Sequence, residues 1–189
     1  MVKDFILASG SPQRKLLLEQ IDMVPAIIEP ADIDETPFKN EKASAYVKRM
    51  AVEKARHVAK KHKGKVVLAC DTIIVCGRKI IQKSHSDEEQ KEVMRLISGK
   101  AHKVLSAVCV IDAAGRESTR LNMTKIMMKN MSEQEICEYV ESHEWVGCAG
   151  YKIEGCLAGL VRKMVGSYSG VVGLPLFETR NLLFGAGIK

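Results

Sequence analysis

The sequence lacks the features that mark membrane-spanning, secreted and zinc-binding proteins. No stretch approaches the roughly 18 consecutive apolar residues of a membrane span. Residues 1–8 hold only a short apolar run and do not form a signal peptide. The six cysteines include no CxxC pair and no His/Cys zinc spacing. We therefore expect a soluble cytoplasmic protein without a membrane partner, in which most cysteines are small buried side chains.

Aromatic residues are also scarce, at 5% of the chain. No helix-turn-helix, zinc-finger or RNA-recognition signature is present, which argues against a nucleic-acid-binding module. Basic residues, in contrast, are in excess, with 29 Lys and Arg against 23 Asp and Glu, for a formal net charge of +6. This excess favours a polyanionic partner, but it does not choose between nucleotides, nucleic acid and anionic lipid.

The chain of 189 residues shows no internal repeat or low-complexity segment, and we expect one domain over residues 1–189. Strand and helix patterns alternate along it, which predicts a mixed α/β fold with helices covering a sheet. The expected strands are 5–8, 25–29, 66–75 with an interruption at 70–72, 79–81, 104–112, 118–128 and 157–164. The expected helices are 13–21, 44–61, 86–98, 132–142 and 175–184.

The first turn is a candidate anion-binding site. A buried strand ends at Ser9, Gly10 and Ser11, and Pro12 begins a helix at once. Free N–H groups at a helix N-terminus bind phosphates, and Arg14 in the first turn of the helix adds a charge-assisted bond. The turn alone is more typical of an ordinary strand-to-helix connection capped by Ser11.

Two acidic positions are candidates for catalysis or metal binding. Asp71 lies inside the apolar run 66–75, where a carboxylate requires a partner. It either faces a cleft where the strand bends or ends, caps a local turn, or pairs with a downstream lysine. The loop 32–35, which contains Glu35, offers oxygen ligands for a hard cation, although a solvated acidic loop is the simpler interpretation.

Two lysines and two glycine-bounded loops complete the candidate set. Lys54 lies in the long helix and Lys83 follows the short hairpin after Asp71. Lysines in such positions are usually at the surface, but in a polyphosphate-binding enzyme they neutralise phosphate charge. The loops 149–155 and 166–176 allow the backbone to pass close to a ligand, or they form plain turns.

Taken in order, these segments resemble the Maf family of nucleotide pyrophosphatases, also described as septum formation inhibitors. The resemblance covers nearly the whole chain, because seven ordered blocks match with the expected gaps. The blocks are SGSPQR at 9–14, DIDE at 32–35, EKA at 53–55, CDT at 70–72, ISGKAHKV at 97–104, AGYKIEG at 149–155 and GSYSGVVGLPL at 166–176, with the family lysine at Lys83.

The resemblance implies an elongated mixed-sheet α/β fold with a deep cleft between two lobes, related to the inosine-triphosphate pyrophosphatases. It implies hydrolysis of nucleoside triphosphates to monophosphate and pyrophosphate, the removal of modified or non-canonical nucleotides, a divalent cation (Mg²⁺ or Mn²⁺) and a homodimer. By the same resemblance, Asp71 is the catalytic base, and Glu35 and Asp71 bind the metal. The implied substrate-binding residues are Ser9, Ser11, Arg14, Lys54 and Lys83 on the phosphates and Glu154 near the base or ribose.

Three departures from the family pattern affect this expectation. Gln13 replaces an arginine of the first motif, which removes one cation, and Ser84 replaces the proline that usually follows Lys83. Glu154 is closer to the branch that acts on 7-methylguanosine triphosphate, while Asp71–Thr72 is closer to the dTTP/UTP branch, so the preferred base stays open. The alternative is a weakly catalytic or non-catalytic regulator of cell division that binds protein or nucleic acid.

Overall fold

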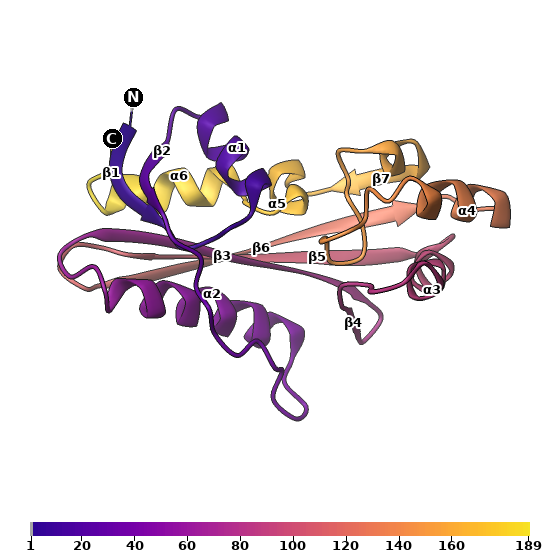
Figure 1. Cartoon of the computed structure of the whole chain (residues 1–189), viewed down its shortest axis with the longest axis horizontal. Coiled ribbons are helices and arrows are strands. Elements are labelled where there is room, and N and C mark those ends of the chain that lie inside the picture. The colour runs from indigo at the N-terminus through magenta and orange to yellow at the C-terminus, as the bar shows by residue number, and fades with distance from the viewer. Residues whose placement is uncertain (1) are drawn as a thin grey trace.

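The computed structural model describes residues 2–189 as an elongated body with two lobes (Figure 1). The strands are β1 (Val2–Leu7), β2 (Val24–Ile28), β3 (Val66–Cys76), β4 (Lys79–Ile81), β5 (Ala101–Ile111), β6 (Glu117–Met128) and β7 (Val161–Val165). The helices are α1 (Pro12–Gln20), α2 (Ala43–Ala59), α3 (Asp87–Ile97), α4 (Glu133–Glu141), the 3₁₀ helix η1 (Cys156–Leu160), α5 (Tyr168–Val172) and α6 (Leu176–Gly185).

The seven strands form one mixed sheet in the order β2-β1-β3-β5-β6-β7, with β4 paired to β3. β1 runs parallel to β2 and β3, and every other pairing is antiparallel. The long strands β3, β5 and β6 run through both lobes, with α1, α2 and α6 at one end and α3 and α4 at the other (Figure 1). The mixed α/β sheet expected from the sequence is therefore confirmed.

One edge of β3 is shared by two different strands, and this arrangement opens the sheet. β5 pairs with β3 along 67–75, whereas the opposite edge pairs with β1 at 66–68 and with β4 at 74–76. Within residues 2–189, the stretch 69–73 therefore has no strand neighbour on that side. Asp71 lies at the centre of this gap.

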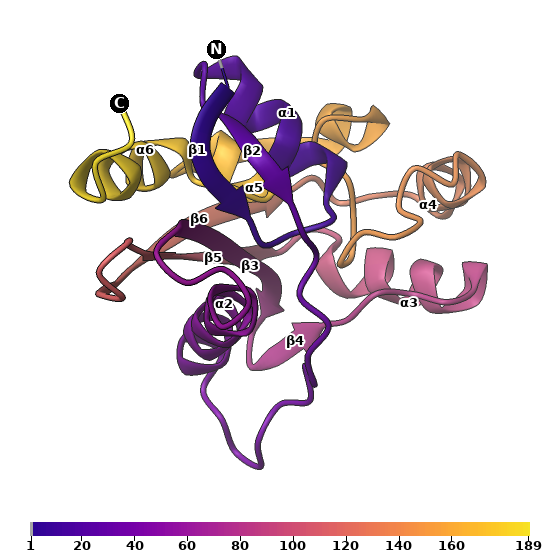
Figure 2. The same cartoon turned by 60° about the vertical axis from the view of Figure 1, so that its left-hand side comes forward.

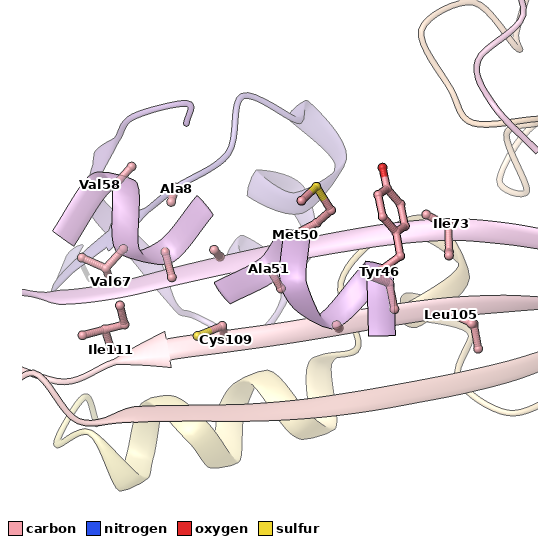
Figure 3. Packing of buried hydrophobic residues seen from close by; sticks show 14 of the residues in the cluster. Ala8, Tyr46, Met50, Ala51, Val58, Val67, Ile73, Leu105, Cys109 and Ile111 are labelled. Carbon is pink, nitrogen blue, oxygen red and sulfur yellow. The ribbon is translucent and has the colours of Figure 1, made fainter. Parts of the chain in front are cut away.

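Alternation along β3 divides the apolar residues between the two faces of the sheet. Val67 and Ala69 face α2, which buries Met50, Ala51 and Val58 against them (Figure 3). On the other face the first half of β3 packs against α1 and α6, and the second half packs in a separate cluster with α3 and α4. Figure 2 shows α2 below the sheet and α5 and α6 above it. Since each buried aliphatic side chain contributes roughly 1.5–3 kcal/mol, each lobe has a substantial core of its own.

The helices differ in whether the side chain of the N-cap serine accepts a hydrogen bond from the first turn. Ser86 caps α3 by accepting a bond from the Glu89 amide at 3.2 Å, and Ser132 forms a capping box with Glu135 at α4. At α1, Ser11 occupies the N-cap position and Pro12 begins the helix, but the Ser11 side chain makes no capping bond. The amides at the start of α1 are therefore not taken up by this side chain.

Three local expectations were wrong. β3 continues without interruption through 70–72, because the residues before and after Asp71 stay paired with β5. The expected strand 157–164 begins as a 3₁₀ helix, and only 161–165 forms a strand, because a short apolar run does not distinguish helix from strand. The short helix α5 lies inside the glycine-bounded segment expected to be a loop. Within residues 2–189, no helix has both the length and the apolar character that a bilayer crossing requires.

A pH-dependent contribution to stability is expected from His102, which is 2% exposed on β5 and hydrogen-bonds the Tyr151 hydroxyl through Nε2 at 2.6 Å. Burial lowers the pKa of His102 from 6.5 to about 4. The unfolded chain then binds more protons in this range, so the stabilisation is present above pH 6.5 and is lost as pH falls towards 4. Urea unfolding should show a loss of about 1 kcal/mol between pH 7.5 and 5.5 that His102→Gln abolishes. The same acid-side slope in both proteins would contradict this assignment.

Candidate functional site

A cleft of about 740 Å³ lies between the two lobes, at the gap in the sheet. All the side chains predicted to form the site line this one cavity. They are Ser9, Ser11, Arg14, Glu35, Lys54, Asp71, Lys83 and Glu154. The cleft that the family resemblance implied is therefore present, and segments far apart in sequence meet in it.

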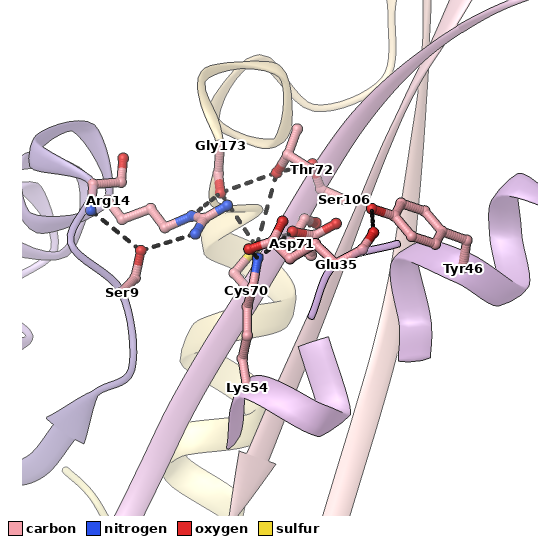
Figure 4. A network of polar contacts seen from close by, with 11 residues as sticks. Ser9, Arg14, Glu35, Tyr46, Lys54, Cys70, Asp71, Thr72, Ser106 and Gly173 are labelled. Carbon is pink, nitrogen blue, oxygen red and sulfur yellow. Dashed lines mark hydrogen bonds and ion pairs between the residues drawn. The ribbon is translucent and has the colours of Figure 1, made fainter. Parts of the chain in front are cut away.

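A buried lysine joins two carboxylates at the centre of the cleft. Lys54 Nζ lies 2.7 Å from Asp71 Oδ1 and 2.9 Å from Glu35 Oε1 (Figure 4). Asp71 projects from the α2 face of β3, where Lys54 on α2 reaches it, and both residues are less than 10% exposed. Two charges so far removed from water are stable only as a hydrogen-bonded pair. The ion pair therefore fixes both groups at the opening of the sheet.

The loop that carries Glu35 is held against α2 through its backbone. Tyr46 donates its hydroxyl hydrogen to the Glu35 carbonyl at 2.8 Å, and Arg49 donates to the Thr36 carbonyl at 3.1 Å. Burial, followed by the negative charges of Asp71 and Glu35, raises the pKa of Tyr46 to about 12. The Tyr46 hydroxyl consequently keeps its proton and remains a donor. The side chain of Glu35 stays about half exposed to the cleft.

The first turn places Arg14 and Ser9 beside this centre. Arg14 Nη1 donates to Ser9 Oγ at 2.8 Å, and Arg14 Nε donates to the Gly173 carbonyl at 2.9 Å. The Ser11 amide donates to Ser9 Oγ at 3.3 Å, and the Ser11 hydroxyl donates to Gln13 Oε1 at 3.3 Å. The turn thus presents hydroxyls, amides and one fixed guanidinium to the cavity, as expected for an anion site.

The opposite end of the cleft is formed by the second lobe. A single bridge pairs Lys83 with Ala149, and Lys83 and Glu154 are both exposed to the cavity there. Burial and the Glu154 carboxylate raise the pKa of the Cys148 thiol, while Lys152 and Lys83 act in the opposite direction. Lys83, Lys152 and Glu154 all line this part of the cavity.

The interpretations left open for Asp71 are now resolved in part. The strand does not end at this residue, and Asp71 lies within it and does not cap a turn. Its ionic partner is Lys54, upstream in sequence, so the proposed pairing with a downstream lysine was wrong. Asp71 reaches the cleft because the neighbouring strands leave a gap, a long-range property that the run 66–75 does not reveal.

Other cleft residues were missed in the sequence. Tyr46 lies in the first turn of α2, and Lys152 lies within the matched block 149–155 without having been assigned a role. Thr72 and Gly173 also line the cavity, and both belong to matched family blocks. Membership of those blocks was the available signal for Thr72, Lys152 and Gly173, whereas Tyr46 lies in no matched block and had none.

The residues present fit a hard divalent cation that takes part of its coordination from a ligand. Glu35 and Asp71 supply oxygen donors directed at one point, now neutralised by the Lys54 ammonium group. In residues 2–189, no group of three or more His, Cys, Asp or Glu side chains is placed to hold a metal. Mg²⁺ needs no such complete cage, because it commonly binds one or two carboxylates together with phosphate oxygens and water.

A family model described as Maf-like protein matches residues 4–186. The chain belongs to the Maf family. A curated relative named dTTP/UTP pyrophosphatase, from Caulobacter vibrioides, is 44% identical over 97% of this chain and 96% of its own length. Another with the same name, from Zymomonas mobilis, is 43% identical over 99% of this chain and 93% of its own.

A solved structure shares the architecture at low sequence identity. The chain superposes on a HAM1 protein from Coxiella burnetii with a TM-score of 0.54 at 17% identity, over 96% of this chain and 98% of that one. At this identity the likeness shows the fold alone. It confirms the expected elongated mixed-sheet architecture.

Removal of Lys54 should destabilise the protein strongly, because it leaves Asp71 buried without a counter-ion. We expect Lys54→Met to lower the free energy of unfolding by about 3 kcal/mol in urea titrations at pH 7.5. Asp71→Asn should cost less, since Lys54 retains Glu35.

Lys61→Met is the matched control, because the Lys61–Glu29 pair is also short, at 2.9 Å, but the Lys61 side chain is 55% exposed. Its expected cost is less than about 1 kcal/mol. Equal losses for the two lysine variants would show that the Lys54 pair is not a buried structural interaction.

Proposed function

We propose that this Maf protein is a nucleoside triphosphate pyrophosphatase that converts a triphosphate and water to a nucleoside monophosphate and pyrophosphate. The observation that carries the proposal is the meeting of Asp71, Glu35 and Lys54 in a cleft that also contains Arg14 and Lys83. The names of the curated relatives support the same reaction. The mixture of carboxylates and cations suits a polyphosphate with its counter-ion better than it suits a neutral ligand.

The phosphate groups bind at the end of the cleft formed by the first lobe. Arg14 contributes a fixed guanidinium, and the turn 9–11 contributes hydroxyl and amide donors at the start of α1. Lys54 adds an ammonium group at this end, and Lys83 extends into the same cavity from the second lobe. Together these groups offset the negative charge that grows on the leaving pyrophosphate in the transition state.

Asp71 acts as the general base. Its carboxylate takes a proton from the attacking water as the water oxygen bonds the α-phosphorus and the bond to the β-phosphate oxygen breaks. Glu35 and Asp71 would hold a Mg²⁺ or Mn²⁺ ion, which supplies charge neutralisation and orientation of the phosphates when bound. Lys54 hydrogen-bonds Asp71 directly at 2.7 Å, which orients the carboxylate before the substrate arrives.

The nucleoside lies towards Glu154 and the loop 147–154 of the second lobe. dTTP and UTP are the proposed substrates, because the relatives that share most of the chain carry that name. Glu154 then accepts hydrogen bonds from the base or ribose. A role in removing modified or non-canonical nucleotides is compatible with this chemistry and stays a prediction.

Other expectations from the resemblance also stay predictions: one domain over 1–189, a homodimer, a cytoplasmic location and the absence of nucleic-acid binding. The alternative of a binding regulator of cell division receives no support from the described cleft, whose arrangement of buried charge is that of a catalytic site.

The activity is tested by pyrophosphate release from dTTP, UTP, dATP, dGTP and 7-methylguanosine triphosphate with Mg²⁺ or Mn²⁺, scored as kcat/KM. We expect turnover of dTTP and UTP above the others. Asp71→Asn should lower kcat by about a hundredfold or more, because it removes the general base.

Asp112→Asn is the control for this substitution, since Asp112 lies in the turn between β5 and β6 and outside the cavity. Absence of turnover in the wild-type protein with every triphosphate and both metals would sink the proposed activity. Full activity in Asp71→Asn would leave the activity standing but would remove Asp71 from its role.

The missing arginine of the first motif should be restorable. Gln13 lines the cavity beside the Ser11 hydroxyl, so Gln13→Arg adds a cation at the phosphate end. We expect KM for dTTP to fall roughly three- to tenfold at low salt, in steady-state assays. Gln20→Arg adds the same charge to the exposed end of α1, outside the cavity, and should leave KM unchanged. No gain in Gln13→Arg would show that the missing arginine does not weaken the enzyme.

A further inference from the structure

A row of buried and half-buried polar side chains crosses the sheet between two of its apolar clusters. On the face away from α2, β3 and β5 place Cys70 and Val108 in the cluster of the first lobe, and Ile74 and Val104 in that of the second. Hydroxyl and amide side chains occupy the positions between them. These residues are Thr72 on β3, Ser106 on β5 and Asn122 on β6, and Thr124 extends the row along β6 to the position that pairs with Val104. Because apolar residues continue on both sides, packing alone does not explain a polar row here.

Side chains of this row hydrogen-bond the backbone of the segment 166–176, which contains α5. Ser106 Oγ donates to the Gly170 carbonyl at 2.6 Å, and Thr124 Oγ1 bonds both the carbonyl of Ser167 at 3.2 Å and its amide at 2.9 Å. The contact is close: a Cβ on Gly170 would lie 2.9 Å from Asn122 Oδ1. Ser106 and Thr124 are each 1% exposed, so these bonds form away from water and fix the segment firmly.

Gly173 follows the last residue of α5, and its carbonyl oxygen lies where several donors meet. Arg14 Nε lies 2.9 Å from this oxygen, Cys70 Sγ 3.2 Å and Thr72 Oγ1 3.3 Å (Figure 4). Burial raises the pKa of the Cys70 thiol, so the thiol keeps its proton and remains a donor. Gly173 has φ 137° and ψ 0°, a conformation that side chains other than glycine rarely adopt.

This carbonyl determines where the Arg14 guanidinium lies. Its Nε is held by Gly173 and its Nη1 by Ser9, and within residues 2–189 its Nη2 has no hydrogen-bond partner. An arginine otherwise has many rotamers, and fixing them in advance removes an entropic cost from ligand binding. The second terminal nitrogen is thus available to a phosphate oxygen in a side chain that is already ordered.

We propose that Ser106 and Gly173 are positioning residues for Arg14: the Ser106 hydroxyl fixes the α5 segment on the sheet, and the Gly173 carbonyl holds the guanidinium at the phosphate end of the cleft. Ser106 does not line the cavity, so it acts on a ligand only through other residues. The inference rests on the proposed function in taking a polyphosphate as the ligand of Arg14. It adds a reason why the segment 166–176 is part of the site although it contributes no charged group near Asp71.

A double-mutant cycle separates positioning from general stability. The four proteins are wild type, Ser106→Ala, Arg14→Ala and the combination of both. The Kd for inorganic tripolyphosphate is measured for each by calorimetry, together with kcat/KM for dTTP. We expect Ser106→Ala to weaken binding and lower kcat/KM by about fivefold when Arg14 is present, and by less than about twofold in the Arg14→Ala background.

Two further variants keep the result interpretable. Ser106→Thr retains the hydroxyl and should restore Kd to within about twofold of wild type. Thr179→Val is the matched control, because Thr179 is fully buried and donates to the Pro175 carbonyl at 2.8 Å without touching Arg14 or Gly173. It should change Tm but not Kd.

The inference is overturned if Ser106→Ala weakens tripolyphosphate binding equally with and without Arg14, if it leaves Kd unchanged, or if the wild-type protein does not bind tripolyphosphate. A protein that shows the coupling in Kd but releases no pyrophosphate from any triphosphate would instead refute the proposed activity while the positioning role stands.

Discussion

The two ion pairs of Lys54 are the interaction on which the site depends. Lys54 comes from α2, Asp71 from the middle of β3 and Glu35 from the loop before α2, so one ammonium group joins three segments. A carboxylate as buried as Asp71 would be strongly disfavoured without it. Because Lys54 holds both carboxylates at the cleft, two negative charges and one positive charge lie together beside the proposed phosphate site. This arrangement suits a metal and a triphosphate arriving together, since each offsets the charge of the other.

The cleft itself is a consequence of sheet topology. Three long strands join the lobes. The edge of β3 that faces away from β5 pairs with β1 at one end and with β4 at the other. Within the uncovered stretch between them, residues 71–73 line the cavity while the strand continues unbroken. The polar row from Thr72 to Thr124 marks the same level of the sheet on the opposite face and fixes the α5 segment there. Two packed cores thus support one rigid site between them.

The sequence was informative about helices, strands and the order of motifs, and less informative about contacts between residues far apart in the chain. Alternation and capping signals placed most helices and strands within a few residues, because local periodicity reports burial directly. The site residues were identified by their order in family blocks, and all of them line one cavity. The pairing of Lys54 with Asp71, and the role of the Gly173 carbonyl, could not be read from the sequence. Both depend on side-chain and backbone groups 17 and 159 residues apart in the chain, brought together only by the sheet.

The central claim is that Asp71 faces the α-phosphate of a bound triphosphate in this cleft. The most direct measurement is a crystal structure of the protein with Mg²⁺ and dUTP carrying a non-hydrolysable imido group between the α- and β-phosphates. We expect the α-phosphorus opposite Asp71 with one water between them, the outer phosphates at Arg14 and the turn 9–11, and the base towards Glu154. A nucleotide bound in the reverse direction, or outside the cavity between the lobes, would contradict it.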